Sequence, residues 1–493
     1  MILLLGLMAL AQSEQSSDLA ERVIVRLGVS YDPVLGAGVA SQVLGADAAL
    51  GTRGLLMPTL NTYALARGAM DLAGTPALSL AEDPHGEHPV LPSVYQRGRT
   101  LLLHLAYAEL EGFAPEGALA NLHLRAGRQL HFGVAAVTFD GATLGYDSGR
   151  FSVAVRGGQR AAVFDRASTL GRAETNPGLV IGGDARYTLE SVSFRAEFLH
   201  FGRTFDGNDF SADVGELAVD ITPTDGLGIT ARASLVIPEL SHLRLQTAYE
   251  IGRTVIVLDL DTKVGRDLSY DLAGGSGTAI GGRRTTLESL RLNIPDAQPY
   301  LDARAAVMFD ATDWLELEPM FGARKVLGDD ADRSPYDADR LVWGLMAGAH
   351  FPVASQSALE VFGDYAGFLY FRPDTGTFTD ASVGGESVVH DVTTGVRYVR
   401  RGAFAMPAID GRLLSRRSLS VGLFGFASTA RWASRYLVST LDELTMGAGI
   451  DGRLDLADVL DLRVSYEVAR GSSTFTGDGG LLHGLRVGVQ GRF

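Results

Sequence analysis

Leu485-Arg-Val-Gly-Val-Gln-Gly-Arg-Phe493 is the stretch of sequence that decides the fold. Counting back from Phe493, every second residue is apolar or small, and the residues between them are polar or small. Successive side chains of a β-strand point to opposite faces, so this strand has one apolar and one charged face. A soluble β-sandwich also contains such strands, but nothing in a sandwich requires the chain to end on an aromatic residue.

The same alternation recurs along the chain in segments of about ten residues. In residues 227–235, for example, Leu, Ile and Ala alternate with Thr230, Arg232 and Ser234. One such strand means little, because half-buried strands of soluble proteins look alike. Repeated many times, with charges of both signs on the polar face, the pattern is typical of a transmembrane β-barrel. A sheet in hydrocarbon has to close on itself, because an open edge would leave backbone groups unpaired.

The C-terminal stretch resembles the last strand of bacterial outer-membrane β-barrels. The resemblance implies that Phe493 belongs to the signal read by the barrel-assembly machinery, and that the protein lies in the bacterial outer membrane among its lipid and lipopolysaccharide. We therefore expect an all-β protein, a transmembrane antiparallel β-barrel formed by a single chain. Segments of this length predict about 18 strands, within a range of about 16 to 20.

The amino terminus begins with an apolar run over residues 1–11, which ends in the A-x-A form of a cleavage site. This run predicts a signal peptide. The alternative is a buried helix or a membrane anchor, although crossing a bilayer takes about 20 residues. We assign residues 1–11 to the signal peptide, 12–58 to an N-terminal periplasmic segment or a first strand, and 59–493 to the barrel.

The predicted connections alternate in length. Short ones include 189–191, 223–226, 310–313 and 456–459; long ones include 158–178, 262–296, 327–340, 372–385 and 471–480. Short turns at one end and long loops at the other match the periplasmic and extracellular ends of outer-membrane barrels. We expect 471–480 to lie outside the cell, because it precedes the strand that ends at Phe493.

Residues 262–296 form the longest predicted loop, and we expect this loop to fold inward and constrict the pore. Deleting the loop should then raise the single-channel conductance, because the narrowest part of the lumen would widen. Recordings from single channels check this, and an unchanged conductance would count against the constriction.

The composition narrows the choice of partner. The net charge is −15, the chain has no cysteine, and Lys263 and Lys325 are the only lysines. An excess of acid without a basic cluster argues against a nucleic-acid partner. Without cysteine, stability in an oxidising periplasm has to come from the hydrogen-bonded sheet. The planar guanidinium of arginine suits a crowded, water-filled lumen, where it binds carboxylates in a bidentate manner.

Charged residues on the polar strand faces are the predicted lining of the pore. Rows of opposite charge would create a transverse field that filters solutes by charge and dipole. Alternatively, the charges neutralise one another and only keep the lumen wet. The predicted pore-lining residues are Arg125, Gln129, Arg195, Glu197, Arg232, Arg244, Glu250, Asp302, Arg304, Glu316, Glu318, Asp364, Arg397, Asp451, Arg463, Glu467 and Arg486.

Leu124-Arg-Ala-Gly-Arg-Gln129, followed by Asp140-Gly141, resembles the L-x-x-G-R-Q…D-G stretch of some large porin-like barrels, including the alginate-export family. In that family basic residues line an anion-conducting lumen, so the resemblance implies that Arg125 and Gln129 lie on the inner wall. Alternation would turn Arg128 towards lipid, where a mid-membrane arginine costs about 2–4 kcal/mol. We therefore expect Arg128 near a rim, or a bulge that resets the phase. The alternative is a strand with ordinary lumen charges.

Neither of the two possible metal motifs has convincing spacing. His85 and His88 lack the helical H-E-x-x-H arrangement, and we interpret them as loop residues. A cluster of aspartates falls in one predicted loop but lacks the EF-hand spacing, so a solvated acidic loop is favoured over a Ca²⁺ or Mg²⁺ site. These aspartates are Asp329, Asp330, Asp332, Asp337 and Asp339. We expect neither a metal nor a cofactor.

The sequence contains no G-x-S-x-G elbow and no Walker A lysine, and we predict that the protein is not an enzyme. Our interpretation is a porin-like channel that passes polar or charged small solutes by diffusion through a mixed-charge lumen. One alternative is a lipid-modifying or proteolytic barrel enzyme, which needs a Ser/His or Asp/His cluster at one rim. The other is a structural or adhesive barrel with a plugged lumen. The solute and the oligomeric state stay open.

Overall fold

The computed structural model describes most of the chain. The described residues are 22–36, 39–55, 57–72, 99–114, 116–134, 137–160, 178–205, 208–265, 298–328, 339–371, 386–401, 417–432, 441–456, 460–473 and 477–492. They form strands and one short 3₁₀ helix, Ala118–Asn121. The expected signal peptide and the terminal Phe493 lie outside these residues. Among the described residues, no helix has the length and apolar character needed to cross a membrane.

The strands form a single sheet. Their bounds are β1 Val23–Gly36, β2 Val39–Arg53, β3 Leu60–Asp71, β4 Arg99–Glu111, β5 Leu122–His131, β6 Val137–Asp147, β7 Phe151–Arg160, β8 Leu179–Thr188, β9 Val192–Phe205, β10 Asn208–Thr224, β11 Leu227–Val236, β12 Glu239–Ile251, β13 Thr254–Lys263, β14 Tyr300–Thr312, β15 Leu315–Val326, β16 Asp339–Ala354, β17 Ser357–Phe371, β18 Glu386–Arg401, β19 Arg417–Trp432, β20 Leu441–Leu456, β21 Leu460–Ser473 and β22 Gly477–Arg492.

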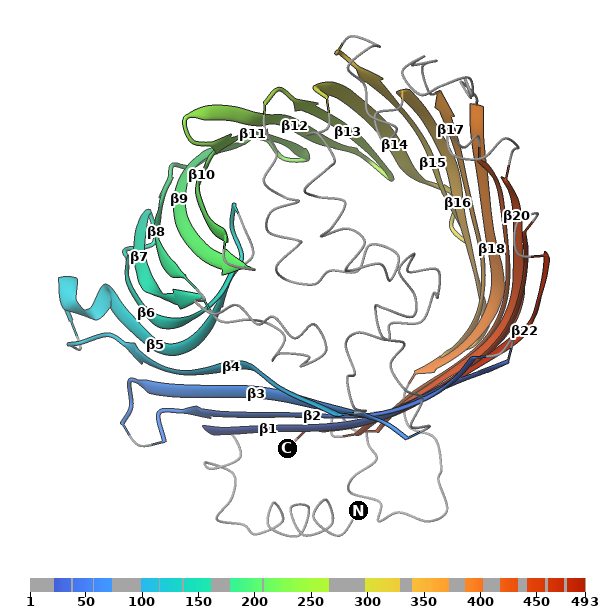
Figure 1. The fold of residues 1–493 in the computed structure, drawn as a ribbon, viewed down its shortest axis with the longest axis horizontal. Helices are drawn as coiled ribbons and strands as arrows, with labels where there is room; N and C mark the ends of the chain where they lie inside the picture. Colours follow the sequence, from blue (N-terminus) through green and yellow to red (C-terminus); the bar gives the residue numbers. More distant parts are fainter. Residues whose placement is uncertain are drawn as a thin grey trace.

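This sheet is a closed antiparallel barrel. Each strand pairs with the next one along the chain, and β1 pairs with β22, so the strands run in sequence order around a ring (Figure 1). The closing seam runs from Arg26 opposite Arg492 to Gly36 opposite Leu482. Closure gives every strand two neighbours, which satisfies the backbone groups that an open sheet would leave unpaired.

The barrel has 22 strands, so the predicted number of about 18 was wrong. Several hairpins turn over only two or three residues at the end where we expected long loops: 37–38, 206–207, 237–238 and 474–476. Such short connections hardly interrupt the alternation of apolar and polar residues. Two strands joined in this way therefore look like one strand in the sequence, and the predicted count is too low. The expected loop at 471–480 is shorter than predicted, because β21 and β22 extend into it.

The N-terminal region contributes more to the barrel than we expected. Residues 23–53 form two full strands, β1 and β2, which pair along their whole length. The expected boundary at residue 59 therefore falls between β2 and β3, inside the barrel. β1 is also the strand that closes the cylinder against β22.

Short turns gather at one end of the barrel, which we call the short-turn end. There, β10 and β11 are joined by Asp225-Gly226, and β12 and β13 by Gly252-Arg253. The φ angles of Gly226 and Gly252 are 90° and 59°, a conformation that two-residue hairpin turns need and glycine adopts freely. Connections 161–178, 264–299, 327–338 and 372–385 join strands at the opposite, long-loop end; most of the predicted constriction loop 262–296 lies outside the described residues.

Candidate functional site: the charged inner wall

Contacts between strands that are not neighbours identify the inner face of the barrel. His131 of β5 lies 2.6 Å from Glu197 of β9, four strands away. Asp302 of β14 likewise contacts Arg340 of β16 past the intervening strand. Side chains of non-adjacent strands can meet only on the concave side of a closed sheet. The residues that share a strand face with these four therefore form the inner wall.

The structure places all seventeen predicted pore-lining residues on this inner wall. Paired residues of neighbouring strands lie on the same face of the sheet. When the register is followed around the ring from the contacts above, each of the seventeen residues falls on the inner face. Two pairs of the predicted residues form ion pairs, Arg304 with Asp302 at 3.2 Å and Arg397 with Asp451 at 3.6 Å. The side-chain amide of Gln129 also donates to the backbone carbonyl of Arg125 at 3.3 Å. The residues opposite in phase face outward, among them Leu217 and Leu423, each 56% exposed.

Arginines from neighbouring strands line up across half of the inner wall. The register links Arg186, Arg195, Ala218, Arg232 and Arg244 in consecutive strands from β8 to β12. We call this set, with its continuation on β13 to β16, the arginine row. The continuation is Asp261, Asp302, Arg324 and Arg340.

An acidic row runs beside the arginine row on β8 to β10, at the inward-facing position two residues away on each strand. Asp184, Glu197 and Glu216 stand opposite one another on β8, β9 and β10. Arg195 of the arginine row donates to Glu216 at 2.8 Å. The two rows give this part of the lumen adjacent bands of opposite sign, the arrangement that produces a transverse field.

Asp302 is the hub of the arginine row towards the long-loop end. Its carboxylate accepts from Arg324 at 2.8 Å and also contacts Arg304 and Arg340, and its side chain is only 4% exposed. Arg324 also stacks on Tyr300, with the guanidinium carbon 3.9 Å from the ring centroid. Three arginines therefore surround one carboxylate, and charge-assisted hydrogen bonds hold the group in place.

Several functional side chains were missed by the sequence reading. Asp259 binds Arg244 in a bidentate manner, at 2.9 and 2.6 Å. Glu109 binds Arg125 at 2.8 Å, and Asp32 of β1 binds Arg486 across the closing seam at 2.8 Å. The same alternation of apolar and charged residues marks these acids, but β1 and β13 are joined to a neighbouring strand by two-residue connections that hardly interrupt the pattern.

Aromatic rings cover part of the inner wall over β17 to β20. Rings of Phe362, Phe424 and Phe426 cover glycines on adjacent strands. A Cβ added at Gly395 would lie 2.4 Å from the ring of Phe362, so the glycine makes room for the ring. Such aromatic cover protects a glycine-containing stretch of sheet. These rings share this part of the wall with the predicted charged residues Asp364, Arg397 and Asp451.

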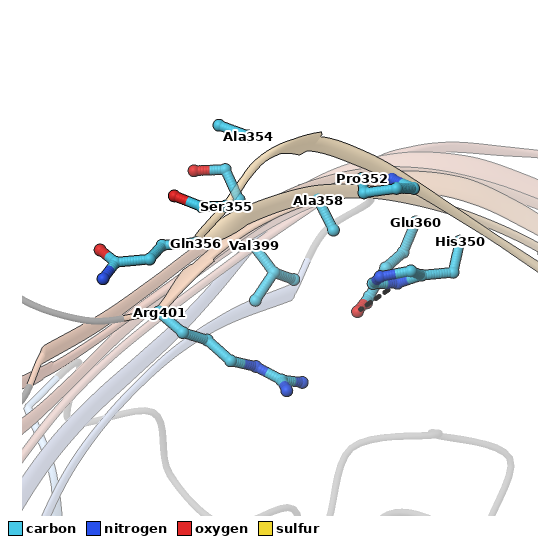
Figure 2. A pocket seen from close by; sticks show the side chains of 10 residues that line it. His350, Pro352, Ala354, Ser355, Gln356, Ala358, Glu360, Val399 and Arg401 are labelled. Atoms are coloured by element: carbon cyan, nitrogen blue, oxygen red, sulfur yellow. Dashed lines mark ion pairs between the residues drawn. The ribbon is translucent and has the colours of Figure 1, made fainter.

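A cavity of about 430 Å³ opens on the inner wall beside the short turn between β16 and β17. Figure 2 shows His350, Glu360 and Arg401 pointing to the same side of the sheet, with Val399 between Arg401 and the other two. His350 and Glu360 are 3.8 Å apart. The cavity thus combines charged groups of both signs with an apolar floor at the short-turn mouth. In the described part of the chain, no group of three or more His, Cys, Asp or Glu side chains is placed to hold a metal.

Arg128 faces outward, and no bulge resets the phase of β5. Its guanidinium binds Asp140 through two hydrogen bonds of 2.7 Å and donates to the carbonyl of Leu103 at 3.1 Å. It lies three residues before the end of β5, close to the long-loop end. Pairing and position both lower the cost of an arginine on this face.

An aromatic cluster also lies on the outer face. The indole N–H of Trp343 donates to the Tyr365 hydroxyl at 3.0 Å, and that hydroxyl is 3.0 Å from Nδ1 of His390. The cluster lies near the long-loop ends of β16, β17 and β18. Aromatic residues with one polar end are typical of a membrane interface.

No family model matches the chain, and no curated protein matches it. Among solved structures, it is similar to OccAB3 of Acinetobacter baumannii, at 10% identity with a TM-score of 0.42, over 96% of this chain and 99% of that one. It is also similar to a double variant of OccD1 (OprD), at 11% identity with a TM-score of 0.44, over 96% and 95%. OccD3 (OpdP) of Pseudomonas aeruginosa gives 11% identity and a TM-score of 0.36, over 96% and 91%. Similarity at this level assigns neither a family nor a solute to the chain.

Proposed function

We propose that the protein is a porin-like channel of the bacterial outer membrane, which passes small polar or charged solutes by diffusion through a mixed-charge lumen. The observation that carries the proposal is the division of one closed barrel into an apolar outside and an inside lined by the arginine row and the acidic row. Each face suits a different solvent, hydrocarbon outside and water inside.

The distribution of apolar side chains supports the membrane location. Large apolar residues on the outer faces are exposed throughout the ring, such as Phe321 at 57%, Leu423 at 56% and Leu345 at 44%. A soluble protein rarely exposes a contiguous apolar surface of this extent. Exposing this apolar surface to water would cost free energy, and hydrocarbon around the barrel removes that cost. The lipid and lipopolysaccharide of the outer membrane would supply the hydrocarbon.

The width of the barrel supports a water-filled lumen that is narrowed from within. Barrels of 16 to 18 strands already leave an aqueous channel, whereas some 22-stranded ones carry a plug. In this chain the charges of the inner wall favour water over a packed interior. The inner positions of Arg125 and Gln129 suit the resemblance to the alginate-export family, which stays a prediction.

Reconstitution into a planar bilayer tests the proposal. Pure, folded protein should produce discrete current steps, because ions cross an open lumen. Conductance and reversal potential measured while the salt is varied would show whether anions or cations are preferred. A folded protein that carries no current would favour a plugged structural or adhesive barrel and would end the channel proposal.

A further inference from the structure

The segment that follows β5 lies against the inner wall four strands away. His131 ends β5, and residues 132–134 continue from it towards β9. The backbone N–H of Val134 donates to the carboxylate of Glu197. Gly133 passes so close that a Cβ there would lie 2.1 Å from Oε1 of Glu197. A side chain at position 133 would displace either the Glu197 carboxylate or the segment itself.

Glu197 is the shared partner of these contacts. Its side chain is 3% exposed, and Oε1 is 2.6 Å from Nε2 of His131. Arg156 of β7, whose side chain is 5% exposed, reaches the same imidazole at 3.1 Å and binds Asp184 of β8. Buried charges are stable only when paired and hydrogen-bonded, so this cluster fixes its members in one arrangement.

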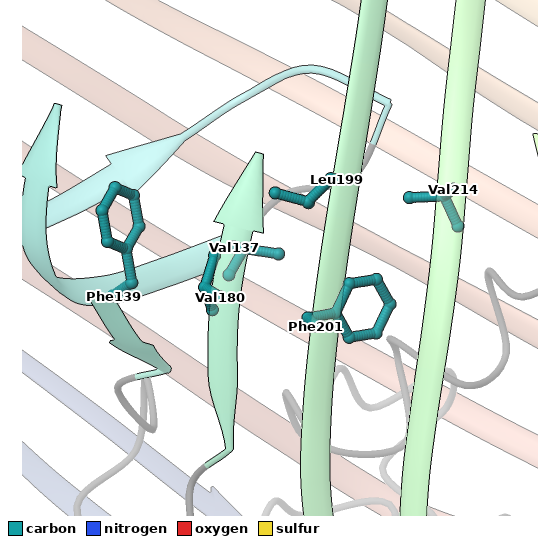
Figure 3. Close-up of a cluster of buried hydrophobic side chains, with 6 residues drawn as sticks. All are labelled: Val137, Phe139, Val180, Leu199, Phe201 and Val214. Carbon is teal, nitrogen blue, oxygen red and sulfur yellow. The ribbon is translucent and has the colours of Figure 1, made fainter. Parts of the chain in front are cut away.

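An apolar cluster beside Glu197 provides a second attachment. Val137 and Phe139 of β6, Val180 of β8, Leu199 and Phe201 of β9, and Val214 of β10 are each at most 4% exposed (Figure 3). Val134 packs against them. Leu199 and Phe201 share the inner face of β9 with Glu197. Apolar residues on a wall that faces water are buried only where something covers them, and Val134 supplies part of that cover.

We infer that Glu197 is a positioning residue, which holds the segment 131–134 against the inner wall and thereby sets the width of the lumen beside β5 to β9. This inference rests on the proposed channel function and adds a determinant of the lumen's width. It does not depend on the loop 262–296. The segment is drawn inward by a carboxylate on a distant strand, so removing that carboxylate should release it without opening the sheet.

The variant Glu197→Gln tests the attachment by hydrogen–deuterium exchange on the folded protein in detergent. The Val134 amide should exchange about ten-fold faster than in the wild type, because the neutral amide oxygen of glutamine is a weaker hydrogen-bond acceptor than the carboxylate. Gly133→Ala should also speed the exchange of the Val134 amide, because the added methyl group pushes the segment away from Glu197. In this variant the residues of the inner wall are unchanged. Glu216→Gln is the matched control: it removes the same charge from the same row, but Glu216 binds Arg195.

Single-channel recordings of the same variants test the consequence for the lumen. Glu197→Gln and Gly133→Ala should raise the conductance by about half or more relative to Glu216→Gln, which reports the effect of removing one acid from the same row, and they should increase the open-channel noise. If the Val134 amide exchanges at the wild-type rate in both variants, Glu197 does not hold the segment. If the amide exchanges faster but the conductance equals that of Glu216→Gln, the segment does not set the width of the lumen. A wild type without current would refute the channel proposal, while the exchange experiment would still decide the attachment.

Discussion

Replacing Val392 by arginine should destabilise the folded barrel by about 2–4 kcal/mol, whereas replacing its neighbour Thr393 by arginine should leave the stability nearly unchanged. Val392 lies in the middle of β18, on the outer face, and is 43% exposed. If hydrocarbon surrounds that face, an arginine there has to be desolvated or has to drag water and headgroups inward. Thr393 faces the lumen opposite Asp364, where a guanidinium meets water and a carboxylate.

Chemical unfolding of the two variants in lipid vesicles measures the difference. A change of 2–4 kcal/mol shifts the unfolding equilibrium by about thirty- to a thousand-fold, which is easily resolved. The two substitutions introduce the same side chain at adjacent positions, so strand propensity and overall charge are matched. Equal destabilisation by both variants would contradict the membrane location of the outer face.

Replacing Arg232 by glutamate should lower the preference of the channel for anions over cations by about five- to ten-fold. Arg232 is exposed on the inner wall in the middle of the arginine row, between Ala218 and Arg244. Arg244 is already bound to Asp259, so Arg232 is the better test of the field in the lumen. An ion passing about 7 Å from a unit charge in water changes its energy by about 0.6 kcal/mol, and reversing the charge doubles the effect.

Reversal potentials measured across a salt gradient near 0.1 M check the selectivity of Arg232→Glu. The effect should shrink at 1 M salt, because the screening length falls from about 10 Å to about 3 Å. Arg232→Gln should give roughly half of the shift. Arg431→Glu, the same reversal at an exposed site on the outer face of β19, should leave the selectivity unchanged. If Arg232→Glu leaves the anion/cation selectivity unchanged, the wall charges only keep the lumen hydrated.

The alternation of apolar and polar residues predicted the barrel and its inner face well, but it failed on the number of strands. Each strand carries its own period of two, so Arg232 and Ile229 could be assigned to opposite faces without knowing their neighbours. Counting strands requires finding the turns. The connection at 206–207 is only Asp206-Gly207, and the one at 237–238 is Ile237-Pro238, too short to break the pattern.

The partners of each charge lay beyond the reach of the sequence. Arg195 pairs with Glu216, and Arg486 with Asp32, 454 positions away. Such pairings follow from the register of neighbouring strands, and a shift by one residue would turn every side chain to the other face. Predicting the contact of His131 with Glu197 requires more than the register, because the contact also depends on the curvature of the sheet over five strands.

By itself, the sequence determined which side chains share the outer face of the barrel and which share the inner face, because that choice depends only on the local alternation along each strand. The tertiary structure alone decided that the ring has 22 strands, that β1 closes it against β22, and that Glu197 reaches the segment after β5. Those features depend on how strands far apart in the chain are brought side by side, and on the curvature that closure imposes on the sheet.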